Sequence, residues 1–127
     1  RYANATSFLV VYEWDGNSRT YNINAGSNTD LEDRDTVSAG SEYLDRVHPE
    51  DREGYRLNFV RYLKGEIDRF DIQYRRRTGL KAPFRWCRDR ANAVRNESGR
   101  TLKLYGIIED IEEPKSIETG LGKERAR

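Results

Sequence analysis

The sequence has few of the residue types that usually carry catalysis or hold a metal. It contains one cysteine, one histidine and no methionine. A single cysteine excludes an internal disulfide and any zinc site made of cysteines alone. The sequence pairs no nucleophile with a base, and it has neither a phosphate-cradling glycine loop nor a metal-ligand cluster. We therefore expect a chain that is not itself an enzyme, with no catalytic residue and no metal site.

Long apolar segments and a charge excess of one sign are also missing. No apolar run approaches the ~20 residues that a membrane span needs, and no signal peptide is evident. Lys and Arg total 23 and Asp and Glu total 22, so the net charge is only +1. This balance gives no bulk electrostatic reason to bind nucleic acid or an anionic membrane. Since the chain starts at Arg1 and lacks methionine, we expect a piece of a longer, cytoplasmic protein.

Aromatic residues offset a low hydropathy. The mean hydropathy of −0.98 and the 35% of charged residues come close to the composition of disordered chains. The eight Tyr, four Phe and two Trp can nevertheless close a small core. The length of 127 residues fits one domain.

The first third of the chain predicts a hairpin and a polar crossover. Residues 8–14 are rich in β-branched and aromatic side chains, and turn-forming residues separate them from a weakly alternating segment at 19–24. Residues 25–46 are mostly Gly, Ser, Asn, Asp and Thr. They predict a solvated loop or short helical turns.

One helix and three further strands follow. Pro49 and two acids predict a helix start, with His48 as its cap, and apolar residues at spacings of three and four extend it over 50–64. Strand-like segments are found at 67–77, 84–95 and 101–111. The last is apolar on both faces and is expected at the centre of the sheet. The order of elements predicts an α+β fold in which helices cover one face of an antiparallel sheet.

Five short motifs occur in a fixed order along the chain. They are Val-His-Pro-Glu-Asp-Arg at 47–52, Gln-Tyr-Arg at 73–75, Phe-Arg-Trp at 84–86, Asn-Glu-Ser-Gly at 96–99 and Gly-Ile-Ile-Glu-Asp-Ile-Glu at 106–112. In order and spacing they resemble a PAS sensor domain, of the subfamily whose long helix opens with His-Pro-Asp-Asp-Arg and whose last strand ends in Asp-Ile-Thr. The resemblance covers residues 7–113 and leaves 1–6 as a lead-in and 114–127 as a linker toward an output domain.

The resemblance implies a five-stranded antiparallel sheet in the order 2-1-5-4-3, with helices on one face and a cavity or a dry core between. It also implies a regulatory module of a bacterial histidine kinase, diguanylate cyclase or phosphodiesterase. Such a module senses a small molecule or relays a rearrangement within a homodimer. A ligand-free dimerisation module is the alternative.

Two departures from the family pattern bear on function. The polar crossover at 31–41 lacks the aromatic-Gly-Tyr-Ser type of segment that normally supplies one wall of a ligand pocket. Glu112 stands where the family has Thr in the element that couples the sheet to its output. Within that element the resemblance assigns the coupling role to Asp110 and Ile111.

Six residues are the candidates for the interior and for any ligand pocket within it. They are Tyr12, Phe59, Phe70, Ile72, Tyr74 and Ile107. An unidentified small ligand fits this apolar set, and an ordinary core fits it equally. No cofactor is expected, because the flavin-binding cysteine motif is absent and His48 lies at a helix cap rather than inside the helix. Cys87 is expected to be a small buried or half-exposed thiol, with redox sensing as the alternative.

Aromatic and arginine side chains gather on the third and fourth of the five predicted strands. Phe84 and Trp86 are candidates for sheet packing or for a dimer face. The arginines from Arg75 to Arg90 interleave with Asp68, Asp71 and Asp89, which predicts cross-strand ion pairs on a wet face. An anionic ligand held by an inward arginine and a nucleic-acid-binding sheet are the alternatives.

Overall fold

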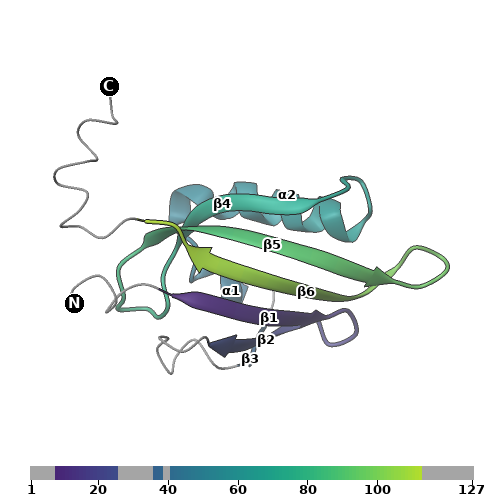
Figure 1. Ribbon diagram of the computed structural model, residues 1–127, viewed down its shortest axis with the longest axis horizontal. Helices are drawn as coiled ribbons and strands as arrows, with labels where there is room; N and C mark the ends of the chain where they lie inside the picture. The colour runs from purple at the N-terminus through teal and green to yellow at the C-terminus, as the bar shows by residue number, and fades with distance from the viewer. Residues whose placement is uncertain (1–7, 26–35, 39–40, 113–127) are drawn as a thin grey trace.

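Six antiparallel strands form one sheet in the computed structural model, which describes residues 8–25, 36–38 and 41–112 (Figure 1). The strands lie in the order β3-β2-β1-β6-β5-β4, and α2 runs across one face of the sheet beside β4 and β5. The elements in chain order are β1 (Leu9–Asp15), β2 (Thr20–Ala25), β3 (Thr36–Ser38), α1 (Ser41–Leu44), a 3-10 turn (Pro49–Asp51), α2 (Arg52–Leu63), β4 (Phe70–Arg76), β5 (Arg85–Arg95) and β6 (Thr101–Asp110).

The predicted α+β fold and strand order are confirmed. Without β3 the order is β2-β1-β6-β5-β4, which is the predicted order 2-1-5-4-3 with the last strand central. The short strand β3 pairs with β2 inside the crossover that was predicted as a loop or helical turns. Three residues are too few to show an alternating pattern. The lead-in at 1–6 and the linker at 114–127 lie outside the described residues.

The start of α2 forms as its sequence indicates. His48 Nδ1 accepts a hydrogen bond from the backbone N–H of Glu50 at 3.1 Å, and Pro49 occupies the first position of the 3-10 turn that leads into the helix. Gly65 follows the helix with a φ of +78°, a conformation that favours glycine. The capping role of His48 is therefore confirmed at the 3-10 turn, whereas α2 itself begins at Arg52, two residues after the predicted start, and ends one residue before the predicted end.

The core lies between α2 and the sheet and consists largely of aromatic rings. Phe59 stacks on Tyr55 with ring centroids 5.9 Å apart and meets Trp14 edge-on at 5.6 Å. Phe70 on β4 meets Tyr55 edge-on at 6.2 Å. Such pairs add to the stabilisation that comes from buried area. Aromatic residues therefore supply a core that the low mean hydropathy alone does not predict.

The interior assignment of Ile107 is wrong. Its neighbour Ile108 is 1% exposed, whereas Ile107 is only half-buried and pairs across the sheet with the exposed Val11. Side chains alternate between the faces of a strand. Because β6 carries apolar residues on both faces, its sequence does not reveal which set is buried.

Substitution of Gly106 tests the packing of β6 against β1. A Cβ atom at this position would lie 2.3 Å from Cζ of Tyr12. We expect Gly106→Ala to lower the free energy of unfolding by about 1–3 kcal/mol, as overpacking does. The matched control is Gly54→Ala, because a Cβ on Gly54 in α2 meets no atom within 4 Å. Urea denaturation should show equal or higher stability for the control, and equal losses in both variants would refute the contact.

Candidate functional site

A carboxylate is buried in the aromatic core. Asp89 on β5 is 1% exposed. Its two oxygens accept hydrogen bonds from the hydroxyls of Tyr12 on β1, at 2.8 Å, and of Tyr74 on β4, at 2.7 Å. A buried charge needs such donors because removing a carboxylate from water is very unfavourable. Asp89 therefore ties together side chains from three strands on the helix-facing side of the sheet.

Sequence reasoning placed Asp89 on the wrong face. The interleaved charges predict that it forms ion pairs in solvent, but it points into the core together with Arg76 of β4. Asp89 alternates along β5 with the buried residues Cys87 and Ala91. Alternation with buried residues along a strand predicts that Asp89 is buried too. The charge of the Asp89 side chain led to the opposite prediction.

The hydrogen bonds of the core continue from Tyr74 to the buried arginine. The hydroxyl oxygens of Tyr43 in α1 and Tyr74 are 2.8 Å apart, and Nε of Arg76 donates to the Tyr43 hydroxyl at 3.0 Å. Arginine only donates, and the one proton of the Tyr74 hydroxyl is used on Asp89. The Tyr43 proton therefore points to Tyr74. The hydrogen bonds from Arg76 through Tyr43 and Tyr74 to Asp89 therefore all point in the same direction. We call this series of four side chains the core relay.

Burial changes the ionisation of the core relay. Removal from water raises the pKa of Asp89 to about 6, while the hydrogen bonds from Tyr74 and Tyr12 and the charge of Arg76 favour the carboxylate. Burial also raises the pKa values of Tyr12 and Tyr74 well above their usual range. The tyrosines are therefore neutral donors at pH 7, and Asp89 is poised to change charge just below neutrality.

Cys87 lies beside this group and is fully buried. Burial raises the pKa of its thiol. The thiolate that redox chemistry requires is therefore disfavoured. This agrees with the interpretation of Cys87 as a small buried side chain.

The structure brings four of the six predicted pocket residues together in the interior. Tyr12, Phe59, Phe70 and Tyr74 are all buried there, and the ring centroids of Phe59 and Phe70 are 6.0 Å apart. Ile72 is half-buried and lines a cleft of about 310 Å³ between α2 and β4, together with Tyr74. The cleft thus adjoins the buried Tyr74, whose hydroxyl contacts Asp89.

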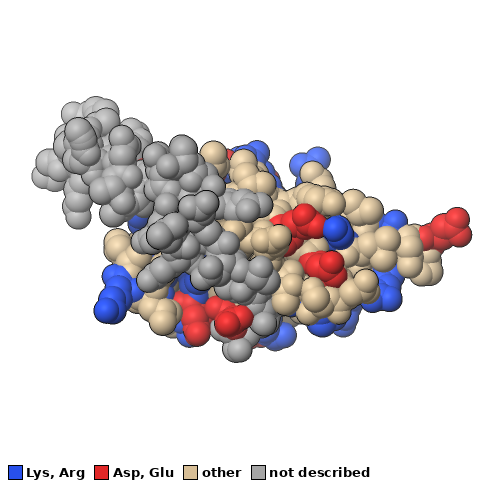
Figure 2. Space-filling model, turned by 90° about the horizontal axis from the view of Figure 1, so that it is seen from below, with Lys and Arg blue, Asp and Glu red and all other residues tan. Residues whose placement is uncertain are grey.

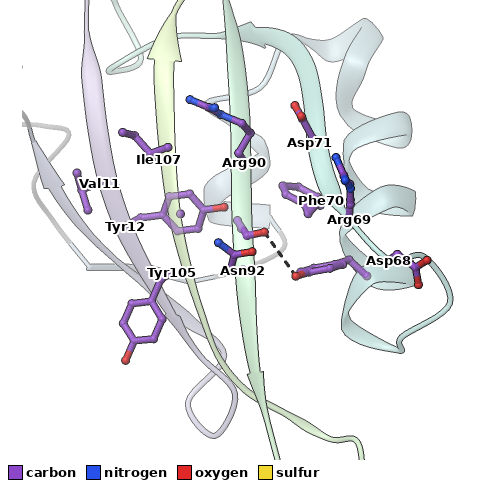
Figure 3. A pocket seen from close by; sticks show the side chains of 13 residues that line it. Val11, Tyr12, Asp68, Arg69, Phe70, Asp71, Arg90, Asn92, Tyr105 and Ile107 are labelled. Atoms are coloured by element: carbon purple, nitrogen blue, oxygen red, sulfur yellow. Dashed lines mark hydrogen bonds between the residues drawn. The ribbon is translucent and has the colours of Figure 1, made fainter.

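Ile107, the sixth candidate, lies on the other face of β6 from Ile108, and the hollow that it lines is also lined by Tyr12 and Phe70. Val11 and Tyr105 line this hollow of about 790 Å³ too, and Figure 3 shows Arg90 and Asn92 among the polar side chains around it. Val11 and Tyr105 are 50% and 48% exposed. The hollow therefore joins an exposed apolar strip of β1 and β6 to polar groups from β5.

A charged site of another kind lies at the end of β6. The Asp110 side chain is 3% exposed and pairs with Arg85 at the start of β5, whose Nε and Nη2 contact its two oxygens. Asp110 Oδ1 also accepts the backbone N–H of Glu112 at 2.9 Å, and the Glu112 carboxylate accepts the backbone N–H of Trp86 at 2.7 Å. We call Arg85, Asp110 and Glu112 the β6 clamp.

The β6 clamp gathers segments from both ends of the described chain. The Asp110 backbone N–H donates to the Phe8 carbonyl, and the Ile111 backbone N–H donates to the Trp86 carbonyl, each at 3.0 Å. Asp110 and Ile111 were the residues expected to couple the sheet to its output. Sequence reasoning did not identify Arg85 as the partner of Asp110, because 25 positions separate them.

The two dimer-face candidates lie next to the clamp. Trp86 is 41% exposed, and the guanidinium carbon of Arg75 lies 5.0 Å from its ring centroid. Phe84 is half-buried against His48 and Arg77, with ring-to-ring and cation-to-ring distances of 4.9 and 4.7 Å. Both side chains thus contact local groups, and their role in a dimer stays a prediction.

Ion pairs occupy part of the arginine stripe, and those of Arg88 and Arg90 join neighbouring strands as predicted. The pairs are Arg75–Asp51 at 2.9 Å, Arg88–Asp71 at 2.7 Å and Arg90–Glu109 at 2.7 Å. Figure 2 shows the molecule from the side of β2 and β3, where basic and acidic side chains are interspersed rather than gathered by sign. The alternative of a nucleic-acid-binding sheet stays a prediction.

Residues 8–25, 36–38 and 41–112 contain no group of three His, Cys, Asp or Glu side chains placed to hold a metal. Among the helices of these same ranges, none combines the length and apolar character of a membrane span.

The buried position of the clamp predicts its contribution to stability. Removing one partner of a buried ion pair leaves the other charge without compensation, so we expect Asp110→Asn to lower the free energy of unfolding by about 2–4 kcal/mol. Asp71→Asn breaks the exposed pair with Arg88 and is the matched control, for which a much smaller loss is expected. Equal losses for the two variants in urea denaturation would contradict the role of burial.

Comparison with known proteins agrees with this architecture. The family model described as "PAS fold" matches residues 27–108. The sensor protein FixL of Bradyrhizobium diazoefficiens is 33% identical over 79 residues, which is 62% of this chain and 15% of FixL. The chain therefore spans only a small part of this curated relative.

Solved structures share the fold at lower identity. A sensory box histidine kinase/response regulator from Burkholderia thailandensis is 21% identical with a TM-score of 0.65, over 98% of this chain and 89% of that one. The N-terminal domain of a diguanylate cyclase with PAS/PAC sensor from Marinobacter aquaeolei is 22% identical with a TM-score of 0.59, over 81% and 94%. With its strand order, its capped helix and the family match over most of its length, the chain belongs to the PAS fold family.

Proposed function

We propose that this PAS sensor domain relays a change in its interior to the chain that follows residue 112, through the β6 clamp. The observation that carries the proposal is the buried pairing of Asp110 with Arg85 at the end of the central strand. A buried ion pair holds its partners in one geometry and is costly to break. A shift of β5 against β6 therefore changes how the chain leaves the sheet.

Strand β5 supplies a direct connection between the interior and the clamp. Arg85, Cys87 and Asp89 are alternate residues of this strand and share its helix-facing side. Asp89 and Arg85 lie four residues apart, which is roughly 13 Å along a strand. Cys87, between them, is directly opposite Asp110 in the register of β5 and β6. A displacement at Asp89 therefore acts on the clamp through two steps of one rigid element.

The setting that we propose is a larger bacterial signalling protein in the cytoplasm, working as a homodimer. A covalently attached histidine kinase or cyclic-diguanylate enzyme would be its output. The likeness to a sensory box histidine kinase and to the sensor of a diguanylate cyclase supports this choice. The exposed Trp86 beside the clamp suits a dimer contact that is sensitive to the same movement.

A second candidate is small-molecule sensing at the cleft between α2 and β4. The cleft holds about 310 Å³ and has Tyr55 and Tyr74 in its wall. A ligand that moves the Tyr74 ring also changes the hydrogen bond from Tyr74 to Asp89. In this candidate a bound ligand causes the change that is transmitted to the β6 clamp. In a ligand-free domain a rearrangement of the dimer would cause it.

The relay is tested on the output of the complete signalling protein. We expect Asp110→Asn to change its kinase or cyclase activity several-fold and to blunt its response to stimulus. Arg85→Lys keeps the charge but loses the two-pronged guanidinium contact, so a smaller change in the same direction is expected without loss of the fold. Arg88→Gln, on the solvent-facing pair, is the control. Unaltered output in folded Asp110→Asn and Arg85→Lys proteins would refute the relay.

A further inference from the structure

We infer that Asp89 is a proton-operated switch: gain of a proton by its carboxylate turns the proton of the Tyr12 hydroxyl away from it and thereby alters the contact of Tyr12 with β6 at Gly106. The inference deepens the proposed function, on which it rests, by naming the change in the interior that the relay transmits. It is argued from the direction of the hydrogen bonds and from the contact between Tyr12 and Gly106.

The two tyrosines on Asp89 differ in their freedom to respond. Tyr74 is the end of the core relay, in which Arg76 donates to Tyr43 and Tyr43 donates to Tyr74. If Tyr74 turned its proton back toward Tyr43, it would meet a hydroxyl proton already directed at it and leave Tyr43 in need of another acceptor. The Tyr12 hydroxyl takes no part in this oriented chain.

A proton on Asp89 therefore has its consequence at Tyr12. The proton comes from solvent and binds the oxygen that Tyr12 contacts at 2.8 Å. The neutral acid then donates where the carboxylate accepted, so the Tyr12 oxygen becomes the acceptor and its own proton rotates away. The negative charge that the Tyr12 hydroxyl and Arg76 faced is lost at the same time.

The end of Tyr12 whose hydroxyl proton turns lies on the central strand. A Cβ atom on Gly106 would be 2.3 Å from Tyr12 Cζ and 2.5 Å from its hydroxyl oxygen, so the phenol end covers the backbone of β6 directly. Tyr12 and Gly106 are also partners in the register of β1 and β6. Gly106 is four residues before Asp110, on the same face of the strand. The switch therefore reaches the β6 clamp along β6 as well as along β5.

Several ionisable groups act on Asp89 from the elements packed around it. They are Tyr12 of β1, Tyr21 of β2, Tyr43 of α1, Tyr55 of α2, Tyr74 and Arg76 of β4, Cys87 of β5 and, from the outer side of β4, Asp71. Burial keeps the tyrosines and the thiol protonated through neutral pH, and Arg76 stays charged. Asp71 is held ionised by Arg88. Asp89 is thus the member of this set that titrates near neutral pH.

The experiment is an NMR pH titration of the 127-residue chain. We expect the carboxyl carbon of Asp89 and the backbone amides of Ile108 and Asp110 to titrate with one midpoint near pH 6. Tyr12→Phe should leave Asp89 titrating and greatly reduce the response of the two amides, leaving the part carried by β5, on which Asp89 is the register partner of Ile108. Tyr55→Phe is the matched control, because its hydroxyl bonds to Tyr21 at 2.6 Å, and it should keep the response.

Two further variants keep the test decisive. Asp89→Asn carries no titratable group and should fix the amides of β6 at their low-pH shifts. His48→Asn retains a helix-capping side chain while removing the one imidazole of the chain, and should leave the titration of Asp89 intact. Amides that do not follow Asp89, or that follow it with undiminished amplitude in Tyr12→Phe, overturn the switch. So does a titration that persists in Asp89→Asn or disappears in His48→Asn.

Failure of the Asp89 switch can be told apart from failure of the relay, the proposed signal transmission through the β6 clamp. If β6 ignores the charge of Asp89 while Asp110→Asn still alters the output of the signalling protein, the switch is wrong and the relay stands. If Asp110→Asn leaves the output unchanged, the relay is wrong whatever Asp89 does.

Discussion

Asp89 brings a carboxylate into a core of aromatic rings, and the arrangement of the interior follows from the need to hydrogen-bond it. Its two oxygens require donors, which Tyr12 and Tyr74 supply from opposite sides of β5. Tyr43 and Arg76 then complete a chain whose direction is set because arginine cannot accept. An apolar residue at position 89 would impose none of these positions, so this single buried charge makes the core specific rather than merely hydrophobic.

The same strand carries the second buried charge pair, and this links the interior to the exit of the chain. Arg85 lies two alternate positions from Asp89 and holds Asp110 at the end of β6. β6 is central in the sheet, and the phenol of Tyr12 rests on its backbone at Gly106. Membership of the PAS fold family accounts for the scaffold. The two buried carboxylates and the strands between them are the particular chemistry of this chain.

Sequence reasoning reached the scaffold more easily than the site. The alternating strands, the His48 cap and the order of motifs predicted the fold, because these signals are local. Ile107 was misplaced because β6 is apolar on both faces, and Asp89 was assigned to solvent because its charge outweighed its place between Cys87 and Ala91. Arg85 was missed as the partner of Asp110, since a contact across 25 positions has no local pattern. For a buried polar side chain such as Asp89, the alternation along the strand is thus a better predictor of burial than the type of residue.

The most direct test of this account is the pH dependence of stability in the wild-type chain compared with Asp89→Asn. Burial raises the pKa of Asp89 to about 6, against about 4 in an unfolded chain, so the folded state holds this proton more tightly between those values. Stability from this group is therefore present below pH 4 and is lost as the pH rises to 6. Between pH 4 and 7 the free energy of unfolding of wild type should fall by about 2–3 kcal/mol relative to Asp89→Asn. A difference between the two proteins that does not change with pH would contradict the buried, ionisable carboxylate on which the account depends.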